Sequence, residues 1–274
     1  MRHARISVAA ILALVTTAPD ACAWHQGDER LVDDTAHTLR SGEIRAGVLS
    51  LDVGTVRFAT IGTDTLPWIA GLYLGSVLGN GHLKVRLVRT APLTLALRGA
   101  VFYSSLHTER GDTTATGHVL LVPLTAATSS DLGRDVSLHL EVTYATLDAK
   151  GDLDVPLAGA RAAIAASALQ TGVMLEYRAT RAVALLLLYR HQPWASPGVI
   201  RTSGEVGTGA RVSLEGNVET ADASTFALTG GVALSGEHAN LRVGAGYGSL
   251  FFPSLGVALP GRTFVPELDF YVRF

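Results

Sequence analysis

The sequence predicts an all-β protein, a transmembrane antiparallel β-barrel of 10–12 strands with 12 strands favoured. The first observation is composition: 48% of the 274 residues are hydrophobic and the mean hydropathy is +0.30. The second is that no segment after residue 23 holds the roughly 18 uninterrupted apolar residues of a membrane helix, so the hydrophobicity is spread over short segments. The third is the 29 glycines, which suit turns and strands better than helices.

The alternation of side chains is clearest in residues 264–274. Apolar residues occupy the even positions, whereas Glu267, Asp269 and Arg273 occupy odd positions. A period of two predicts a strand with one apolar and one polar face. Its eleven residues match the roughly 9–11 that a tilted strand needs to cross a bilayer.

Internal segments repeat this pattern, and residues 136–147 are the clearest of them. The predicted strands are residues 43–49, 56–61, 82–89, 93–103, 117–124, 136–147, 169–178, 183–190, 210–218, 226–234 and 241–247. Residues 117–124 and 183–190 are apolar on both faces, so the pattern does not orient them. A further short strand at 199–203 is left open. Residues 66–79 are left open as a short helix, a capping segment or a strand.

Four longer connections are expected to form loops on the outer side of the barrel. They are residues 104–116, 148–167, 191–205 and 248–262. His107 and Glu109 in the first loop are expected to be solvated, with cation binding as the alternative. Phe251-Phe252-Pro253 in the last loop are expected to anchor at the membrane interface, with a contact patch for lipid or a partner as the alternative.

Residues 1–23 show the order of a secretory signal peptide. Basic Arg2 and Arg5 precede the apolar residues 6–17, and Ala21 to Ala23 offer small side chains for cleavage. Residues 24–41 are polar and acidic and are predicted to form a periplasmic lead-in, and residues 42–274 are predicted to form the barrel.

Composition and cysteine use exclude several classes of function. Cys22 is the only cysteine and would leave with the signal peptide, which excludes disulfides and thiol chemistry. The net charge is −2, and no basic block predicts nucleic-acid binding. No cofactor or metal site is predicted, and the oligomeric state is left open.

The signal peptide, the alternation and the terminal Phe274 together resemble bacterial outer-membrane β-barrels. This resemblance covers the mature chain and implies the outer membrane of a Gram-negative bacterium. It also implies contact with outer-membrane lipid and lipopolysaccharide, and insertion by the barrel-assembly machinery with Phe274 as the assembly signal. The N-terminal third is similar to uncharacterised proteobacterial barrels, and the residues that carry this similarity are Thr38-Leu39, Gly42-Glu43, Gly47, Ile61-Gly62-Thr63, Asn80 and Leu83-Lys84-Val85-Arg86.

The polar faces of the predicted strands supply candidates for the lumen of the barrel. These candidates are Lys84, Arg86, Arg98, His139, Glu141, Glu176, Arg178, Arg211, Glu215, Arg242, Glu267, Asp269 and Arg273. Because unpaired buried charges are costly, we expect these charges to pair across the lumen, with a hydrated pore as the alternative.

Three functions remain open at this point. The first is a narrow pore or transport-linked barrel for small solutes. The second is a structural or interaction barrel that binds lipopolysaccharide or a partner through its outer loops. The third is an outer-membrane lipid hydrolase using Ser137, His139 and Glu141, which lie two residues apart on one strand face. Since that face should point into the lumen, away from lipid, we expect no enzymatic activity and no catalytic residues.

Overall fold

The computed structural model describes residues 31–274, apart from residues 66, 69–76, 91, 111, 156–157, 181, 197, 207–209, 219–224, 237 and 253–256. The predicted signal peptide and residues 24–30 lie outside this described part of the chain. No helix among the described residues is long and apolar enough to cross a membrane.

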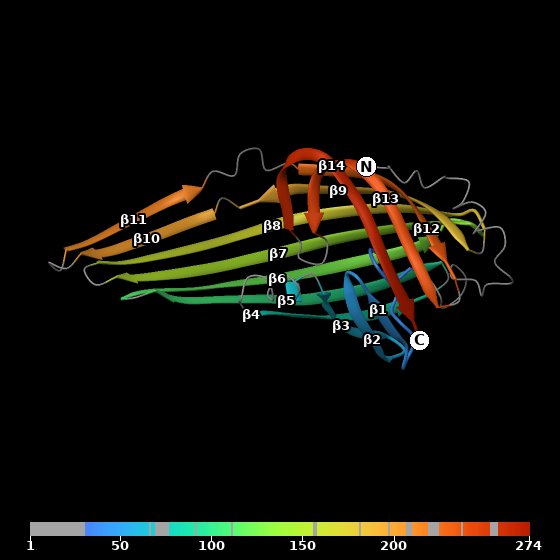
Figure 1. The fold of residues 1–274 in the computed structure, drawn as a ribbon. Helices are drawn as coiled ribbons and strands as arrows, with labels where there is room; N and C mark the ends of the chain where they lie inside the picture. The colour runs from blue at the N-terminus through green and yellow to red at the C-terminus, as the bar shows by residue number, and fades with distance from the viewer. Residues whose placement is uncertain are drawn as a thin grey trace, which may run out of the picture.

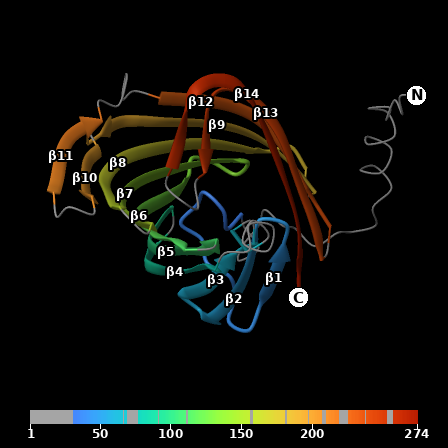
Figure 2. The ribbon, with the colours of Figure 1, turned by 60° about the vertical axis from the view of Figure 1, so that its left-hand side comes forward.

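Nearly all of the described chain is β-sheet. The strands are β1 (Ile44–Gly47), β2 (Ser50–Val56), β3 (Ala59–Asp64), β4 (Val77–Arg89), β5 (Leu93–Arg110), β6 (Thr113–Asp131), β7 (Val136–Val155), β8 (Ala158–Arg178), β9 (Val183–Ala195), β10 (Gly198–Val206), β11 (Ala210–Val218), β12 (Thr225–Ser235), β13 (Ala239–Phe252) and β14 (Val257–Arg273). Strands β1 to β9 and β12 to β14 pair with their neighbours, all antiparallel, and β1 pairs with β14. They form a closed ring of twelve strands, which confirms the predicted fold class (Figures 1 and 2).

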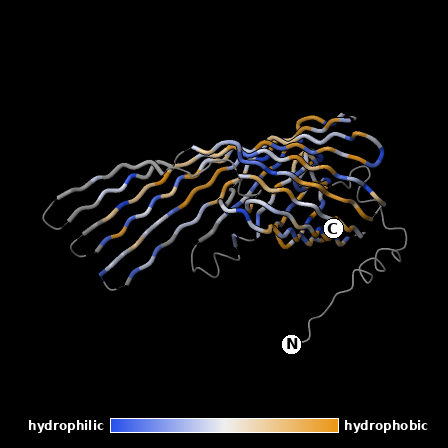
Figure 3. The backbone as a smooth tube through the Cα atoms, turned by 90° about the horizontal axis from the view of Figure 1, so that it is seen from above, coloured by the Kyte–Doolittle hydropathy of each residue, from blue (hydrophilic) through white to orange (hydrophobic). Residues whose placement is uncertain are grey.

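The barrel buries polar side chains and exposes apolar ones. In β14, Leu268 and Phe270 face outward, whereas Asp269 and Arg273 are buried. In β7, Leu140 and Val142 are exposed, whereas His139 and Thr143 are buried. Hydrophobic and hydrophilic colours accordingly alternate along the strands (Figure 3). This inverted pattern is the one that a lipid environment favours, since charges on the lipid face are destabilising.

The four predicted outer loops are largely continuous strand. β7 has 20 residues, or about 66 Å at the rise of a strand, against a hydrocarbon core of about 30 Å. The sheet formed by β5 to β8 therefore projects far beyond the barrel, and β10 and β11 extend it as a hairpin paired to β8 (Figure 1). β10 contains the short strand left open at 199–203.

This hairpin corrects two of the lumen candidates. Arg211 and Glu215 lie on β11, which pairs only with β10 and is not part of the twelve-stranded ring. Alternation predicts which residues share a face of a strand, but it does not predict which hairpins enter the ring. These two positions therefore lie outside the ring.

Candidate functional site

The N-terminal segment, residues 31–40, runs inside the ring of strands (Figure 2). Leu31, Ala36 and Leu39 are almost completely buried. Leu31 packs in an apolar cluster with Met174 of β8 and Leu188 of β9. Residues 31–40 were predicted to form part of a periplasmic lead-in, but the structure places them in the lumen. They lie there because they contact both apolar and charged residues of the barrel wall.

Two acidic residues attach the N-terminal segment to the barrel wall. Asp34 Oδ2 accepts hydrogen bonds from Arg190 of β9 and Arg242 of β13, each at 3.0 Å. Asp33 pairs with the buried Arg45 of β1, with one contact at 2.6 Å. Buried charges are costly unless they are paired and hydrogen-bonded, so these contacts fix where the segment lies.

The pKa of Asp34 reflects this environment. Burial alone would raise its pKa, because a low-dielectric site disfavours the carboxylate. The guanidinium groups of Arg190 and Arg242 outweigh burial and hold the pKa well below its ordinary value. Asp34 therefore stays ionised across the physiological pH range.

Backbone contacts complete the attachment of the N-terminal segment. Lys84 Nζ donates to the carbonyl of Val32 at 2.6 Å. The amide of Ala36 donates to Ser129 Oγ at 2.8 Å, and the amide of Leu39 donates to Thr60 Oγ1 at 2.9 Å. These bonds join the segment to β3, β4 and β6, so it contacts the wall on several sides.

The segment borders a chamber of about 620 Å³ in the lumen. Val32, Asp33, Asp34 and Thr35 form part of its lining. Such a volume lies within the roughly 300–1,000 Å³ typical of small-molecule sites. The chamber is therefore the candidate functional site.

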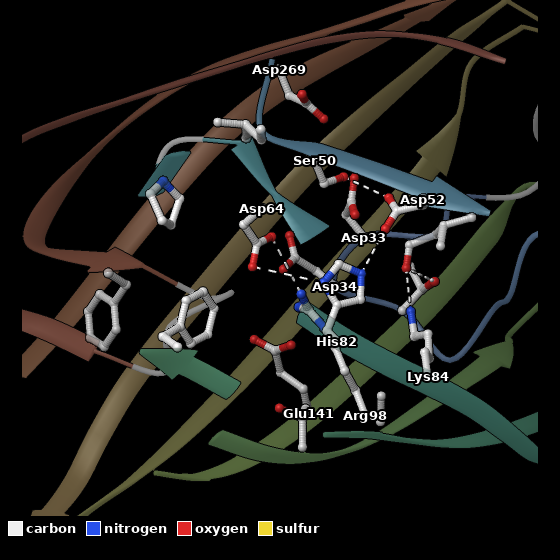
Figure 4. A pocket seen from close by; sticks show the side chains of 18 of the residues that line it. Asp33, Asp34, Ser50, Asp52, Asp64, His82, Lys84, Arg98, Glu141 and Asp269 are labelled. Carbon is white, nitrogen blue, oxygen red and sulfur yellow. Dashed lines mark hydrogen bonds and ion pairs between the residues drawn. The ribbon is translucent and has the colours of Figure 1, made fainter. Parts of the chain in front are cut away.

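A pair of side chains on β2 and β4, Asp52 and His82, forms part of the chamber wall. His82 Nε2 lies 2.7 Å from Asp52 Oδ1, and Asp64 Oδ2 lies 3.9 Å from His82 Nδ1. Figure 4 shows the carboxylates of Asp33, Asp34, Asp52 and Asp64 grouped around His82. The backbone leaves room for the pair only because residue 62 is glycine: a Cβ there would lie 2.0 Å from Asp52 Oδ1 and 2.6 Å from His82 Nε2.

The wall of the chamber becomes apolar toward the end of the barrel far from the C-terminus. Phe102 follows Arg98 along β5, and Leu147 follows Glu141 along β7. Phe102 and Leu121 belong to a buried apolar cluster against which Leu147 packs, and all three line the chamber. The chamber thus combines a charged region beside the N-terminal segment with an apolar region beyond it.

The structure divides the predicted lumen residues into groups. Those that line the chamber are Lys84, Arg98, Glu141, Arg242, Glu267 and Asp269. Glu141 lies 3.9 Å from Arg190, and Arg98 lies 3.7 Å from Asp64. The chamber therefore collects about half of the candidates, from strands on opposite sides of the ring.

Three further candidates lie toward the strand ends near the C-terminus. Arg178 contacts Asp131 at 3.6 Å and donates to Ser137 Oγ. Arg273 pairs with Glu43. Arg86 is only partly buried and donates to the carbonyl of Arg57. These residues satisfy the polar groups at that end of the barrel and do not line the chamber.

The structure does not join Ser137, His139 and Glu141. Ser137 Oγ donates to Asp131, whereas His139 contacts Ser129 Oγ at 2.8 Å and Glu176 at 3.1 Å. Ser129, His139 and Glu176 are all almost fully buried. Because Ser129 Oγ also accepts the amide of Ala36, this chain of hydrogen bonds anchors the N-terminal segment.

Several site residues were missed by reasoning from the sequence, and they are Asp33, Asp34, Arg45, Asp52, Asp64, His82 and Arg190. His82 lies two residues before Lys84, so alternation did carry a signal for it. Arg190 follows the leucine run 185–188, which masks alternation. The inward-facing Leu186 and Leu188 are apolar because they pack in the cluster that holds Leu31.

His107 and Glu109 lie on the exposed projecting part of β5, 3.0 Å apart. Within the described ranges, no group of three or more His, Cys, Asp or Glu residues is arranged to hold a metal ion. The pair is a solvated contact on the strand.

The solved structures that are similar to this chain share little of its sequence. No family model matches the sequence, and no curated protein matches it. The toluene transporter TodX of Pseudomonas putida aligns with a TM-score of 0.48 and 9% identity, over 84% of this chain and 77% of that one. The translocator domain of the autotransporter NalP of Neisseria meningitidis aligns with a TM-score of 0.40 and 12% identity, over 84% and 83%. The ferric yersiniabactin receptor FyuA of Yersinia pestis aligns with a TM-score of 0.42 and 12% identity, over 82% and 39%. These similar structures are outer-membrane β-barrels.

Proposed function

We propose that this protein is an outer-membrane barrel that admits small solutes to its chamber, and that the N-terminal segment closes the path through the barrel. The observation that carries this proposal is the position of residues 31–40, which border a chamber of about 620 Å³ and pair with the wall through Asp33 and Asp34. Passage then requires the segment to move aside.

The attachment of the segment is of a kind that can be released. Its interactions are polar contacts from a short stretch of chain and two apolar clusters, one around Leu31 and one around Ala36. No strand of the ring has to unpair for the segment to leave, because the segment is not itself part of the sheet. A change in a few ion pairs can therefore open the lumen without dismantling the barrel.

The test is the conductance of the refolded mature chain in a planar bilayer. The variant Asp33→Asn/Asp34→Asn removes the two carboxylates through which the segment pairs with Arg45, Arg190 and Arg242, so we expect it to conduct more than the unmodified chain. The control Asp148→Asn/Asp152→Asn removes two carboxylates from the projecting part of β7, where they pair with Lys150 and Arg161. Equal conductance in the two variants and the unmodified chain would reject the proposal.

The projecting sheet favours a second function, that of an interaction barrel. Strands β5 to β8, β10 and β11 build a surface well beyond the ring (Figure 1). A surface of this size suits contact with lipopolysaccharide or a protein partner. Removing the β10–β11 hairpin should abolish such binding and leave conductance unchanged.

We propose no enzymatic role. Ser129 is the serine that contacts His139, and its Oγ already accepts the Ala36 amide, so the hydroxyl is covered by the N-terminal segment. An acyl-transfer site would need that hydroxyl open to a lipid ester. The refolded barrel should therefore not hydrolyse phospholipid, and turnover that is lost in Ser129→Ala would overturn this proposal.

A further inference from the structure

Two buried acceptor atoms in the chamber wall face each other without a hydrogen-bond donor. Asp64 Oδ2 and His82 Nδ1 have no hydrogen-bond partner among the described residues, although both side chains are more than nine-tenths buried and line the chamber. Buried polar atoms are normally satisfied, so an unsatisfied pair calls for an explanation.

The donors and acceptors around Asp64 and His82 define what kind of group can satisfy these two atoms. Asp52 accepts from Ser50 at 2.6 Å and from Arg45 at 3.3 Å, and as a carboxylate it has only acceptors to offer His82. In its neutral form, His82 donates its Nε2–H to Asp52, which leaves Nδ1 as an acceptor. Asp64 Oδ2 is an acceptor as well. Two acceptors 3.9 Å apart are satisfied together by one group with at least two hydrogen atoms to donate.

The charge of the chamber favours a cation as that group. Seven carboxyl groups and five Lys or Arg side chains line it, which gives a formal excess of two negative charges when every carboxyl is counted as ionised and His82 as neutral. Asp64 has its nearest cation, Arg98, at 3.7 Å, beyond hydrogen-bond distance. Asp64 is held in place through its backbone, whose amide donates to Asn80 Oδ1 and whose carbonyl accepts from Asn80 Nδ2.

We infer that the chamber binds small primary amines in their ammonium form, with the ammonium group between Asp64 and His82 and an apolar tail against Phe102, Leu121 and Leu147. An ammonium group donates three hydrogen bonds and carries the charge that Asp64 lacks. The apolar wall beyond the charged region takes the tail. This inference rests on the proposed solute-admitting function and names its substrate class.

The test compares three probes of one size on the refolded mature chain: butylammonium, 1-butanol and butyrate. Titration calorimetry against a detergent blank should show the tightest binding for butylammonium. Asp64→Asn should weaken butylammonium by at least about tenfold, because it removes a charge-assisted hydrogen bond. The matched control Asp148→Asn should bind as the unmodified chain does.

If Asp64→Asn does not fold, the binding of the three probes to the unmodified chain still tests the inference. Binding of 1-butanol or butyrate as tightly as butylammonium would overturn the inference. A water molecule would then be the group that donates to Asp64 and His82. An unchanged affinity in a folded Asp64→Asn variant would also overturn it. If Asp33→Asn/Asp34→Asn conducts but butylammonium does not bind, only this inference fails. If butylammonium binds but no variant conducts, only the proposed pore fails.

Discussion

At the scale of single residues, the charged lumen depends on small side chains as much as on charged ones. The Asp52–His82 pair occupies the space that a side chain at residue 62 would fill. Gly172 likewise lies against Glu141, since a Cβ there would be 2.5 Å from the Glu141 carboxylate. Polar groups in a narrow barrel therefore need glycines on the neighbouring strands.

Replacing Gly62 with alanine should destabilise the barrel by about 1–3 kcal/mol, the usual cost of overpacking. The added methyl group would push Asp52 and His82 apart. The control is Gly81→Ala on β4, where the nearest atom to a Cβ is 3.7 Å away. Thermal unfolding followed by circular dichroism should separate the two variants, and equal melting temperatures would contradict the account of Gly62.

Because of Asp34, the attachment of the N-terminal segment inside the lumen depends on pH in a defined direction. A carboxyl whose pKa is lowered in the folded state contributes stability above its ordinary pKa and loses it as pH falls through the lowered value. The segment should therefore stay seated from neutral pH down to about pH 4 and be released only in stronger acid. NMR shifts of the Ala36 and Leu39 amides report this, and a release between pH 7 and 5 would count against it.

At the scale of elements, the sequence predicted the strands of the ring well. It predicted less well what packs against their inner faces and how far the strands continue beyond the ring. Residues 264–274 and 136–147 alternate because lipid lies on one side of them and polar groups on the other, and both are strands of the ring. Residues 183–190 did not alternate because their inner face meets the apolar Leu31. Loops were predicted at 104–116 and 148–167, where polar strands continue into water and lack an apolar face to reveal them.

The position of residues 31–40 inside the lumen could not be predicted from the sequence. Asp33 and Asp34 are acidic residues in a polar stretch, which favours solvent when read alone. Their partners Arg45, Arg190 and Arg242 come from strands far apart in the chain, and only the closed ring brings them together. The chamber residues on β4, β5 and β7 could be predicted, because they lie on the polar faces of strands in which polar and apolar residues alternate clearly.

The last strand supports a prediction about assembly. Phe274 exchanges backbone hydrogen bonds with Ile44, so its main chain helps to close the ring, while the residue as a whole is 72% exposed. Phe274→Ala should keep those backbone bonds and the stability of the refolded barrel. It should lower the amount inserted in the outer membrane of cells, measured by fractionation and immunoblot. Normal membrane levels would show that the side chain is not an assembly signal.

At the scale of the whole molecule, the protein is a closed barrel with two unequal parts. One part is a ring whose lumen holds charged groups, a chamber and the N-terminal segment. The other is a sheet that projects from one side of the ring (Figure 1). The ring carries the proposed passage of solutes, and the projecting sheet offers a surface for contacts outside the membrane.

The most direct test of the central claim locks the N-terminal segment to the wall. Ala36→Cys and Ser129→Cys, added to Asp33→Asn/Asp34→Asn, place two thiols on neighbouring residues, because the Ala36 amide now lies 2.8 Å from Ser129 Oγ. A chain built from residue 24 holds no other cysteine, because Cys22 is the only one in the sequence. Single-channel recording of this variant should show a closed barrel when the disulfide is formed and an open one after reduction. Identical conductance before and after reduction would contradict the claim that residues 31–40 close the lumen.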